Sequence, residues 1–513
     1  MSAGFVIGAR QIGTTDLALT CDVCVIGSGA GGAVLAAGLA ARGLDVIVLE
    51  EGGAYTSADF RRLDEAWSLP TLYQERGGRA TADQAITVLQ GRSVGGGTTV
   101  NWTTCFRMPE RILDHWRQVH GLALTAEALA PHFAAIEDRL GIATWDAVAP
   151  NENNHKLELA GAALGWETAR TRRNVRGCAN SGYCGFGCPF DAKQAMHLTY
   201  VPDALAAGAR VYADTRADRL ELDGTNVARV HATVMDPDRD RGGPVKITVS
   251  AARVAVCGGA INSPALLLRS GLDDGVVGRR TFLHPVVAAA GRFADRVDGW
   301  YGAPQSVASH QFVDRGPDAS GFFLEHAPIH PMLSGVSFPG FGAGKNAMMG
   351  TLSHTATMIA IHVDGLAPDD AGGTVSLRGD GRIRLDYPVS DRLARGFRAS
   401  HEVLVRGLFA AGAIEVSTLH AEPVVFGSVD DLSALDRAAY GALRHSIFSA
   451  HQMGGCPMGP DPATSVVDPA LRHHRVPNLW VVDGSVLPTA LGVNPSETIY
   501  GIAHWAVEGV SAG

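Results

Sequence analysis

The stretch CDVCVIGSGAGGAVLAAGLAARGLDVIVLEEGG, residues 21–53, decides the fold of this chain. It begins with a short apolar run, residues 23–26, that is typical of a buried parallel strand, and a helix of small residues follows a glycine-rich turn. Gly27, Gly29 and Gly32 occupy the three glycine positions of a G-x-G-x-x-G turn. These positions permit a sharp bend, the approach of a pyrophosphate to the backbone, and close packing of helix on strand.

A second strand and an acidic residue complete this unit. The apolar run at residues 44–49 ends at Glu50, eighteen residues after Gly32, where a carboxylate can accept hydrogen bonds from an adenosine ribose. The N-terminus of the intervening helix carries a partial positive charge that favours phosphate. Because strand, helix, second strand and acid follow in register, the pattern predicts dinucleotide binding, but it does not distinguish NAD from FAD.

Length, charge and hydropathy set broader limits. A chain of 513 residues is too long for one ordinary core, so we expect two joined domains or one doubly wound domain with insertions. The net charge is −9 and no run of lysine or arginine is long enough to contact a phosphate backbone, which argues against nucleic-acid binding. Because we find no secretory pattern and no stretch near about 18 uninterrupted apolar residues, we expect a cytoplasmic protein without stable membrane insertion.

Three further motifs follow the first in a defined order. GRSVGGGTTVN at 91–101 places a second glycine cluster after a strand-like run, and GGAINSPALLLRSGL at 258–272 indicates a glycine turn before an apolar helix. NLWVVDGSVLPTALGVNPSETIYGIAHWA at 478–506 combines a buried strand, a turn and a final helix. Together these motifs resemble those of the glucose-methanol-choline (GMC) oxidoreductases, although Cys105 and Asp273 depart from the family pattern.

The resemblance implies a fold and a cofactor. The implied fold is α/β: a Rossmann-like FAD-binding domain of the GMC type with an antiparallel-sheet substrate-binding domain capped by helices. The implied cofactor is FAD rather than NAD. Its matching residues fall into an adenosine-diphosphate site, a loop against the flavin, and contacts near the C-terminus. They are Gly27, Gly29, Gly32 and Glu50; Gly95, Gly96 and Asn101; and Asp483, Gly484, Asn494 and Pro495.

His451 and Asn494 are the predicted catalytic residues. His451 lies in HQMGGCPMG, residues 451–459, and Asn494 in GVNP, and both strings resemble those of the sterol-oxidase and long-chain-alcohol-oxidase branches. A neutral imidazole can accept the hydroxyl proton of an alcohol, while an amide can hold the substrate oxygen. We therefore expect His451 to be a base rather than a metal ligand or a packing residue. The adjacent glycines are expected to bring this backbone close to the flavin, and His284 is expected to be a structural or surface residue.

Cys178, Cys184 and Cys188 form the pattern C-x5-C-x3-C-P, which has two interpretations. Bacterial flavin sugar dehydrogenases of the same family hold a three-iron cluster with this spacing, and the final C-x3-C-P is similar to ferredoxin motifs. Alternatively, the loop packs over the flavin with buried thiols or a disulfide, whereas zinc would need a fourth ligand. We favour packing and predict no metal, because the sequence shows neither a haem motif nor an export signal.

The motif positions predict the domain organisation. A discontinuous FAD-binding domain comprises 1–110, 196–288 and 446–513, residues 111–195 form a helical insertion with the Cys-rich loop, and 289–445 form the substrate-binding domain. GGTVSLRGDGRIRLDYPVSD, within the last segment, predicts a hairpin in an antiparallel substrate-side sheet. Glu325 is a candidate polar group of the substrate cavity. The apolar wall of that cavity is expected to contain Phe322, Phe323, Met332, Phe338, Phe341, Met348 and Met349.

These features predict an FAD-dependent alcohol oxidase or dehydrogenase that acts on CH–OH groups. We expect oxidation of a primary, hydrophobic aliphatic alcohol to the aldehyde, with hydride transfer to flavin N5 and reoxidation by dioxygen to hydrogen peroxide. One alternative is an FAD dehydrogenase that passes electrons through an iron–sulfur cluster to a partner. Others are a hydroxynitrile lyase-like FAD protein without net redox chemistry and a non-catalytic electron-transfer subunit. The expected partners are the alcohol and dioxygen, with a protein electron acceptor only if a cluster is present.

Overall fold

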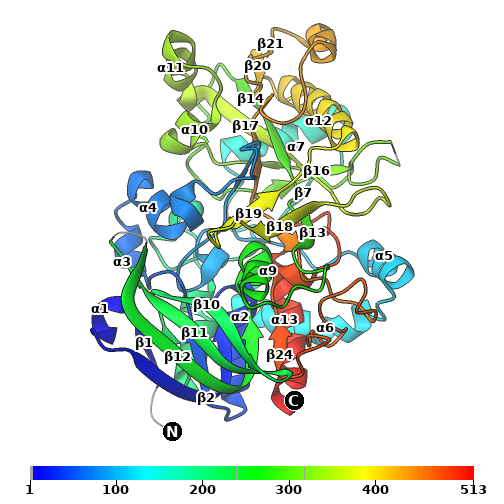
Figure 1. Cartoon of the computed structure of the whole chain (residues 1–513). Coiled ribbons are helices and arrows are strands. Elements are labelled where there is room, and N and C mark those ends of the chain that lie inside the picture. The colour runs from blue at the N-terminus through cyan, green and yellow to red at the C-terminus, as the bar shows by residue number, and fades with distance from the viewer. Residues whose placement is uncertain (1–3, 239–240, 317) are drawn as a thin grey trace.

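A mixed sheet lies in the lower half of the molecule in the computed structural model, which describes residues 4–238, 241–316 and 318–513 (Figure 1). Its strand order is β1-β9-β3-β2-β12-β11-β10, and β24 also pairs with β12. Strands β10 and β11 pair antiparallel, whereas the pairs that link β1, β9, β3, β2, β12 and β24 are parallel. The bounds are β1 Phe5–Ile7, β2 Leu17–Ile26, β3 Val46–Leu49, β9 Arg210–Tyr212, β10 Thr215–Asp223, β11 Asn226–Asp236, β12 Arg241–Val256 and β24 Leu479–Val481.

The helix that follows the first glycine motif is built of small residues because it is closely packed. α2 (Ala30–Ala41) contacts both the mixed sheet and the C-terminal helix α13 (Ser496–Ala512). A Cβ atom on Gly32 would lie 1.9 Å from the carbonyl oxygen of Gly27. A larger residue would therefore push the helix away from the turn, which confirms the predicted close packing at Gly32.

A second, mostly antiparallel sheet lies above the first (Figure 1). Its order is β16-β17-β14-β20-β21, and β22 joins β14 to β4. Helices α7 (Glu152–Leu164) and α12 (Asp391–Ala410) pack on one face. The structure thus confirms the predicted α/β class with an antiparallel sheet capped by helices. The bounds are β4 Ile86–Val88, β14 Val286–Arg292, β16 Phe322–His326, β17 Thr355–His362, β20 Glu415–Thr418, β21 Val425–Phe426 and β22 Ile447–Ser449.

The predicted hairpin exists and lies in a small antiparallel sheet. β18 (Gly373–Leu377) and β19 (Ile383–Asp386) pair antiparallel across the expected turn. β18 then pairs with β13 (Arg279–Phe282), and β13 with β23 (Met453–Gly454). Because β18 pairs there, the hairpin forms a small sheet beside the loop of His451 rather than a part of the larger antiparallel sheet.

The helical region expected at 110–165 is also present, but it serves two cores. α5 (Glu110–His120) and α6 (Ala126–Leu140) contribute buried residues to the core of the mixed sheet, whereas α7 packs against the antiparallel sheet. The insertion is therefore shared, and the predicted domain boundaries stay a prediction. The remaining α-helices and strands of the described residues are α1 Ala9–Ile12, α3 Ser57–Phe60, α4 Glu65–Leu72, α8 Tyr200–Ala206, α9 Gly259–Arg269, α10 Pro331–Ser337, α11 Gly342–Gly350, β5 Thr104–Cys105, β6 Ile142–Thr144, β7 Ala169–Arg170, β8 Arg172–Asn174 and β15 Val307–Ala308.

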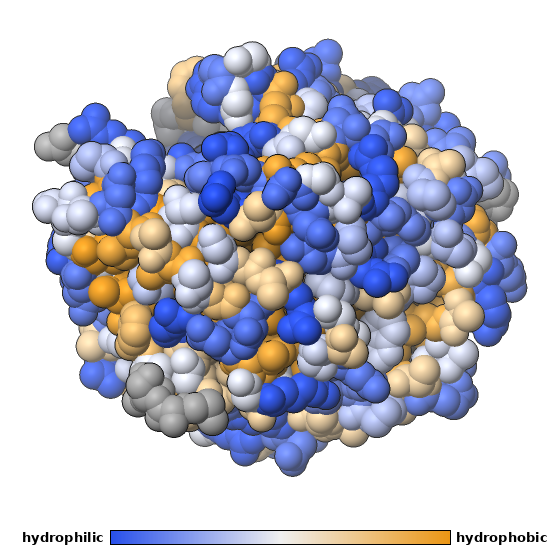
Figure 2. All heavy atoms as spheres, turned by 60° about the horizontal axis from the view of Figure 1, so that its bottom comes forward, coloured by the Kyte–Doolittle hydropathy of each residue, from blue (hydrophilic) through white to orange (hydrophobic). Residues whose placement is uncertain are grey.

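The molecular surface is mixed in character. On the face that Figure 2 shows, hydrophilic side chains predominate and apolar ones form small groups between them, as is ordinary for a globular protein. Among the described residues, we find no helix with the length and apolar character needed to cross a bilayer.

Candidate active site

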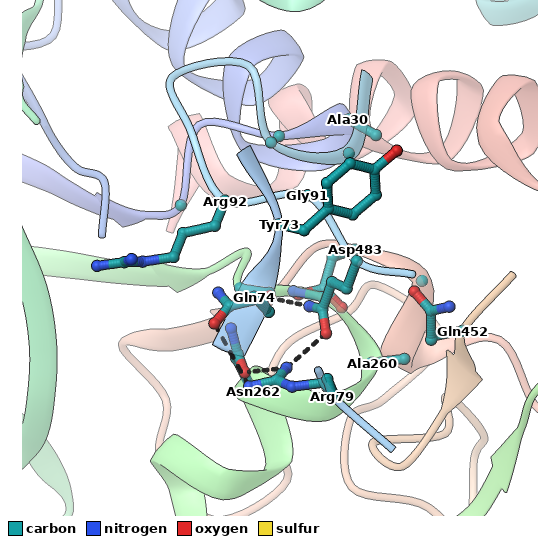
Figure 3. Close-up of a pocket in the computed structure, with 18 of the residues that line it drawn as sticks. Ala30, Tyr73, Gln74, Arg79, Gly91, Arg92, Ala260, Asn262, Gln452 and Asp483 are labelled. Atoms are coloured by element: carbon teal, nitrogen blue, oxygen red, sulfur yellow. Dashed lines mark hydrogen bonds between the residues drawn. The ribbon is translucent and has the colours of Figure 1, made fainter. Parts of the chain in front are cut away.

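A cavity of about 900 Å³ lies where the mixed sheet meets the antiparallel sheet. Figure 3 shows part of its wall, including Tyr73, Gly91, Gln452 and Asp483. Gly32 and Gly95, two of the predicted cofactor residues, do not line it. The others line the cavity together with His451: Gly27, Gly29, Glu50, Gly96, Asn101, Asp483, Gly484, Asn494 and Pro495.

Glu50 connects two of the glycine loops at one end of the cavity. Its Oε2 accepts hydrogen bonds from the Ser28 amide at 3.0 Å and the Ser28 hydroxyl at 2.7 Å, while its Oε1 accepts one from the Gly52 amide at 2.9 Å. Ser28 Oγ in turn accepts a hydrogen bond from the Gly95 amide at 3.0 Å. Burial raises the pKa of Glu50, and the hydrogen bonds from Gly52 and Ser28 oppose this shift. Gly95 therefore contributes through its backbone, behind the cavity wall.

The glycines of this end form a cradle that side chains would fill. A Cβ atom on Gly96, whose φ is +54°, would lie 2.7 Å from Gly29 Cα. One on Gly31 would lie 1.9 Å from the Val482 carbonyl oxygen. Gly29 is the N-cap of α2 and supplies no side-chain cap, so the first amides of the helix can face a phosphate. The cradle thus fits the pyrophosphate of a dinucleotide.

Asp483 lines the cavity, but both oxygens of its carboxylate accept hydrogen bonds from other residues of the protein. Oδ2 accepts hydrogen bonds from the Gly259 amide at 2.8 Å and the Ser263 hydroxyl at 2.5 Å, and Oδ1 accepts one from the Ser485 amide at 2.8 Å. Burial raises its pKa, while these hydrogen bonds lower it. Asp483 therefore aligns the start of α9 with the C-terminal turn, in addition to any contact with the cofactor.

Sequence reasoning missed a buried arginine in the cavity wall. Arg79 Nη1 donates to Gln90 Oε1 at 2.6 Å and to Asn262 Oδ1 at 2.9 Å, and Nη2 donates to Gln74 Oε1 at 3.4 Å (Figure 3). Its Nε donates to Glu75 at 3.0 Å. Three of its partners lie within eleven residues and Asn262 is 183 residues away, but Arg79 stands in no motif, so its place in the cavity wall could not be inferred from the sequence.

His451 and Asn494 meet at the other end of the cavity. Asn494 Nδ2 lies 3.3 Å from His451 Nε2. Burial lowers the pKa of His451 to about 4, so the imidazole is neutral near pH 7. Gly454 and Gly455 do not themselves line the cavity, although Ala450, His451 and Gln452 just before them do. A Cβ atom on Gly454 would lie 1.9 Å from the Arg280 carbonyl oxygen, so this glycine instead permits the close pairing of β23 with β13.

His284 is a second histidine of this site, although the sequence indicated only a structural or surface role for it. It is fully buried, and its Nδ1 lies 3.2 Å from His451 Nδ1. Its Nε2 accepts a hydrogen bond from the Gly492 amide at 3.1 Å. The string FLHP, with a histidine at the end of a strand, was the available signal, but only the fold places it against His451.

Glu325 lies beside Asn494 on the other side. Its side chain is fully buried, and neither carboxyl oxygen has a hydrogen bond of good geometry with the described residues. Burial raises the pKa of Glu325 to about 8, and the Asn494 amide is the neighbouring group that opposes the shift. A buried carboxyl of this kind can exchange a proton near neutral pH.

Comparison with known proteins assigns the chain to a family. Two GMC oxidoreductase family models match it, the N-terminal model at residues 69–286 and the C-terminal model at 368–503. The chain is a GMC oxidoreductase. A GMC-type oxidoreductase of Mycobacterium tuberculosis is 34% identical over 94% of this chain and 74% of its own length. A long-chain-alcohol oxidase of Arabidopsis thaliana is 30% identical, with 95% and 68% covered.

Solved structures show the same fold. A pyridoxine 4-oxidase from Mesorbium loti has a TM-score of 0.71 at 21% identity and covers 96% of this GMC oxidoreductase and 99% of its own chain. A formate oxidase of Aspergillus oryzae has a TM-score of 0.70 at 15% identity, with 97% and 99% covered.

GMC oxidoreductases are FAD-dependent flavoenzymes that oxidise CH–OH groups, so the predicted cofactor and enzyme class are confirmed. The site fits FAD on structural grounds. Its glycine cradle admits a pyrophosphate, and the loop of Gly96 presses against Gly29. At the other end of the cavity, Asn494 is part of the wall, and its amide oxygen has no hydrogen-bond partner among the described residues.

The Cys-rich loop of this GMC oxidoreductase is fastened beside the cavity. Lys193 Nζ donates to the carbonyl oxygens of Thr99 at 2.5 Å, Asn101 at 3.1 Å and Cys184 at 2.7 Å. Cys184 and Cys188 are buried and Cys178 is half-buried, all with free thiols. No group of three His, Cys, Asp or Glu side chains in the described part of the chain is arranged to hold a metal ion. That the loop holds no cluster stays a prediction. The burial of Cys184 and Cys188 is explained by packing.

The apolar wall at the His451 end is not the one expected. Trp102, Val286, Ile359, Ile361 and Phe448 line the cavity there. Met332, on α10, is instead 41% exposed, and Phe341, which precedes α11, is 92% exposed. Phe322 and Phe323 are buried in the core, and none of the seven predicted wall residues lines the cavity. The strand alternation of the sheet, rather than the apolar run, selects the residues that face the cavity.

Proposed function

We propose that this GMC oxidoreductase oxidises a primary, hydrophobic aliphatic alcohol to the aldehyde, with dioxygen as the final electron acceptor and hydrogen peroxide as the second product. The observation that carries the proposal is the His451–Asn494 pair, 3.3 Å apart, at the apolar end of the cavity. FAD supplies the hydride acceptor when it is bound. The cytoplasmic location stays a prediction from the sequence.

The residues of the chain act on the hydroxyl group. The Asn494 amide and the His451 imidazole are placed to hold the substrate oxygen from one side of the cavity. Two groups can accept the hydroxyl proton: His451, as expected from the sequence, and Glu325, whose buried carboxyl lies beside Asn494. Removal of that proton concentrates negative charge on the oxygen, and hydrogen bonds to the oxygen stabilise this charge.

The lining of the cavity supports an apolar substrate. Val286, Ile359, Ile361 and Phe448 come from three strands of the antiparallel sheet and form the wall near His451. A sugar would need several converging polar groups, whereas this wall presents aliphatic and aromatic surface. The similarity to long-chain-alcohol oxidases of Arabidopsis thaliana points in the same direction.

A second candidate is a dehydrogenase that passes electrons through an iron–sulfur cluster to a protein partner. The observation that favours it is the link through Lys193, which joins the backbone of Cys184 to that of Thr99 and Asn101 at the flavin loop. A cluster on Cys178, Cys184 and Cys188 would therefore lie in a segment coupled to the cofactor loop.

The test is the visible spectrum of the purified holoprotein before and after addition of dodecanol under argon, with glucose as the control. We expect dodecanol to bleach the flavin and air to restore it, with one hydrogen peroxide formed per aldehyde. About three irons per chain and slow reoxidation in air would favour the dehydrogenase instead. A flavin that no alcohol bleaches, in a protein that cleaves hydroxynitriles, would identify a lyase.

A further inference from the structure

A chain of polar contacts runs through the two histidines of the site. The Gly492 amide donates to His284 Nε2 at 3.1 Å, His284 Nδ1 lies 3.2 Å from His451 Nδ1, and His451 Nε2 lies 3.3 Å from the Asn494 amide. The first link has a fixed direction, because a backbone N–H can only donate. Nε2 of His284 must therefore be the ring nitrogen without a hydrogen.

The direction of the first link determines the others. A neutral imidazole carries one hydrogen, so His284 carries it on Nδ1 and donates to Nδ1 of His451. Burial holds the pKa of His284 well below its ordinary value, with a further contribution from the neighbouring His451, which keeps the ring neutral. His451 accepts at Nδ1, and its own hydrogen is then on Nε2, the nitrogen beside Asn494.

We infer that His284 is a positioning residue that fixes the tautomer of His451, so that His451 meets the substrate oxygen as a hydrogen-bond donor through Nε2–H. The inference rests on the proposed function for the identity of the substrate oxygen, but not for the tautomer. It adds a residue to the site and reverses the expected role of His451 as the base.

The surroundings of Asn494 agree with this assignment. The amide oxygen of Asn494 has no partner, while its nitrogen faces His451 Nε2. The oxygen and nitrogen of an amide are exchanged by a half-turn of the group. With the oxygen toward His451, Nε2–H gains an acceptor in the resting enzyme, and a protonated Glu325 beside Asn494 gains one too. Glu325 can accept the hydroxyl proton of a substrate only in its ionised form, which its pKa of about 8 places above neutral pH.

His284 is held in place by a buried acid that lies outside the cavity. Asp364 accepts hydrogen bonds from the Leu283 amide at 2.9 Å and the His284 amide at 3.1 Å, and from the Tyr387 hydroxyl at 2.6 Å. His284 has a φ of +46°, a left-handed conformation that a non-glycine residue adopts only when its surroundings impose it. The hydrogen bonds that the Leu283 and His284 amides donate to Asp364 hold this conformation, which directs the ring between Gly492 and His451.

The chain offers a matched pair of substitutions for the test. The amide nitrogen of His284→Asn takes the place of Nδ1 and can still donate to His451, whereas His284→Gln places its amide near Nε2 and leaves Nδ1 without a substitute. The tautomer of His451 is read from ¹⁵N NMR of the holoprotein labelled with [¹⁵N]histidine, with His451→Gln used to assign its signals. FAD content and melting temperature report whether each variant folds.

We expect His451 to carry its hydrogen on Nε2 in the wild type and in His284→Asn, and to change to a mixture or to Nδ1–H in His284→Gln. We also expect His284→Gln to lower kcat/KM for dodecanol roughly 10²- to 10⁴-fold, as other enzymes lose activity with a wrong histidine tautomer, and His284→Asn to recover most of that loss. A wild-type His451 with Nδ1–H would overturn the inference, as would His284→Gln with unchanged tautomer and activity. The wild-type spectrum needs no substrate. It therefore tests the tautomer of His451 even if the protein oxidises no alcohol.

Discussion

The two ends of the cavity are built in different ways. At the end lined by Gly27, Gly29 and Glu50, which we call the adenosine end, these residues come from one continuous strand–turn–helix–strand unit. The two glycines act there through their backbone. At the alcohol end, His284, Glu325, His451 and Asn494 come from four separate segments that only the tertiary fold brings together. A site made from one local unit can be recognised in a sequence, whereas a site assembled across the fold is recognised only in part.

The largest expected effect separates the two ends. His451→Gln should lower kcat/KM roughly 10²- to 10⁴-fold, because it removes the imidazole at the substrate oxygen. FAD content should stay at the wild-type value, since the adenosine end is untouched. Steady-state kinetics and flavin absorbance of the purified variant check both statements. A variant that loses FAD and activity together would show that the two ends are not independent.

Glu325 predicts a pH dependence of the alcohol end alone. Its pKa of about 8 means that the carboxyl is protonated below that pH and ionised above it. If it accepts the proton, kcat/KM should rise with pH to a plateau above about 8, and at pH 6 it should be roughly 10² lower than the plateau. Glu325→Gln should remove this limb. A limb that persists in the variant would exclude Glu325 as its source.

The same shift predicts an effect on stability. Because the folded-state pKa is raised, the protonated form is the one that the fold accommodates. The stability that this protonation contributes is complete below the unfolded-state pKa of about 4.3 and is lost as pH rises through about 8. Compared with Glu325→Gln, the wild type should therefore lose melting temperature between pH 5 and pH 9. Parallel melting curves of the two proteins would contradict the assigned pKa.

Gly96→Ala tests the adenosine end alone. Its Cβ would lie 2.7 Å from Gly29 Cα at a φ of +54°, so the two loops must separate. We expect about tenfold weaker FAD binding, equivalent to roughly 1.4 kcal/mol, with unchanged kcat for the fraction that retains FAD. Gly350→Ala is the control, because its Cβ would meet no atom within 4 Å and it lies outside the cavity lining. Equal FAD affinity in both variants would argue against the cradle.

Phe448→Ser should change the alcohol end only slightly. Phe448 is one of several residues of the apolar wall, so its loss should raise KM for dodecanol several-fold and KM for a short alcohol less. Kinetics over a series of chain lengths measure the difference. An equal change for all alcohols would mean that the alkyl chain does not contact this wall.

Cys178→Ser should have the smallest effect if the Cys loop only packs. Cys178 is half-buried and lies outside the cavity lining, so activity should stay within about twofold and iron should be absent before and after the substitution. If the wild type contained iron and the variant lost it, Cys178 would be a cluster ligand and the loop would take part in electron transfer.

Sequence reasoning reached most of the adenosine end and half of the alcohol end. The positions of Gly27, Gly29 and Glu50 were predicted because their spacing follows from one supersecondary unit. His451 and Asn494 were recognised through a resemblance. Arg79 was missed because it stands in no motif, and the role of His284 was missed because its partners His451 and Gly492 lie far away in the chain. The apolar wall was misplaced because an apolar run does not show which side of a strand faces a cavity.

By itself, the sequence determined that the chain has a dinucleotide-binding unit, belongs with the GMC oxidoreductases and carries a histidine and an asparagine suited to alcohol chemistry. These are local patterns of residues that are close together in the chain, so they can be recognised in the sequence. Only the tertiary structure decided which nitrogen of His451 faces the substrate, because that depends on a backbone amide of Gly492 and a ring of His284 that approach from separate segments. Hydrogen-bond direction is a property of contacts in space, and the fold alone creates those contacts.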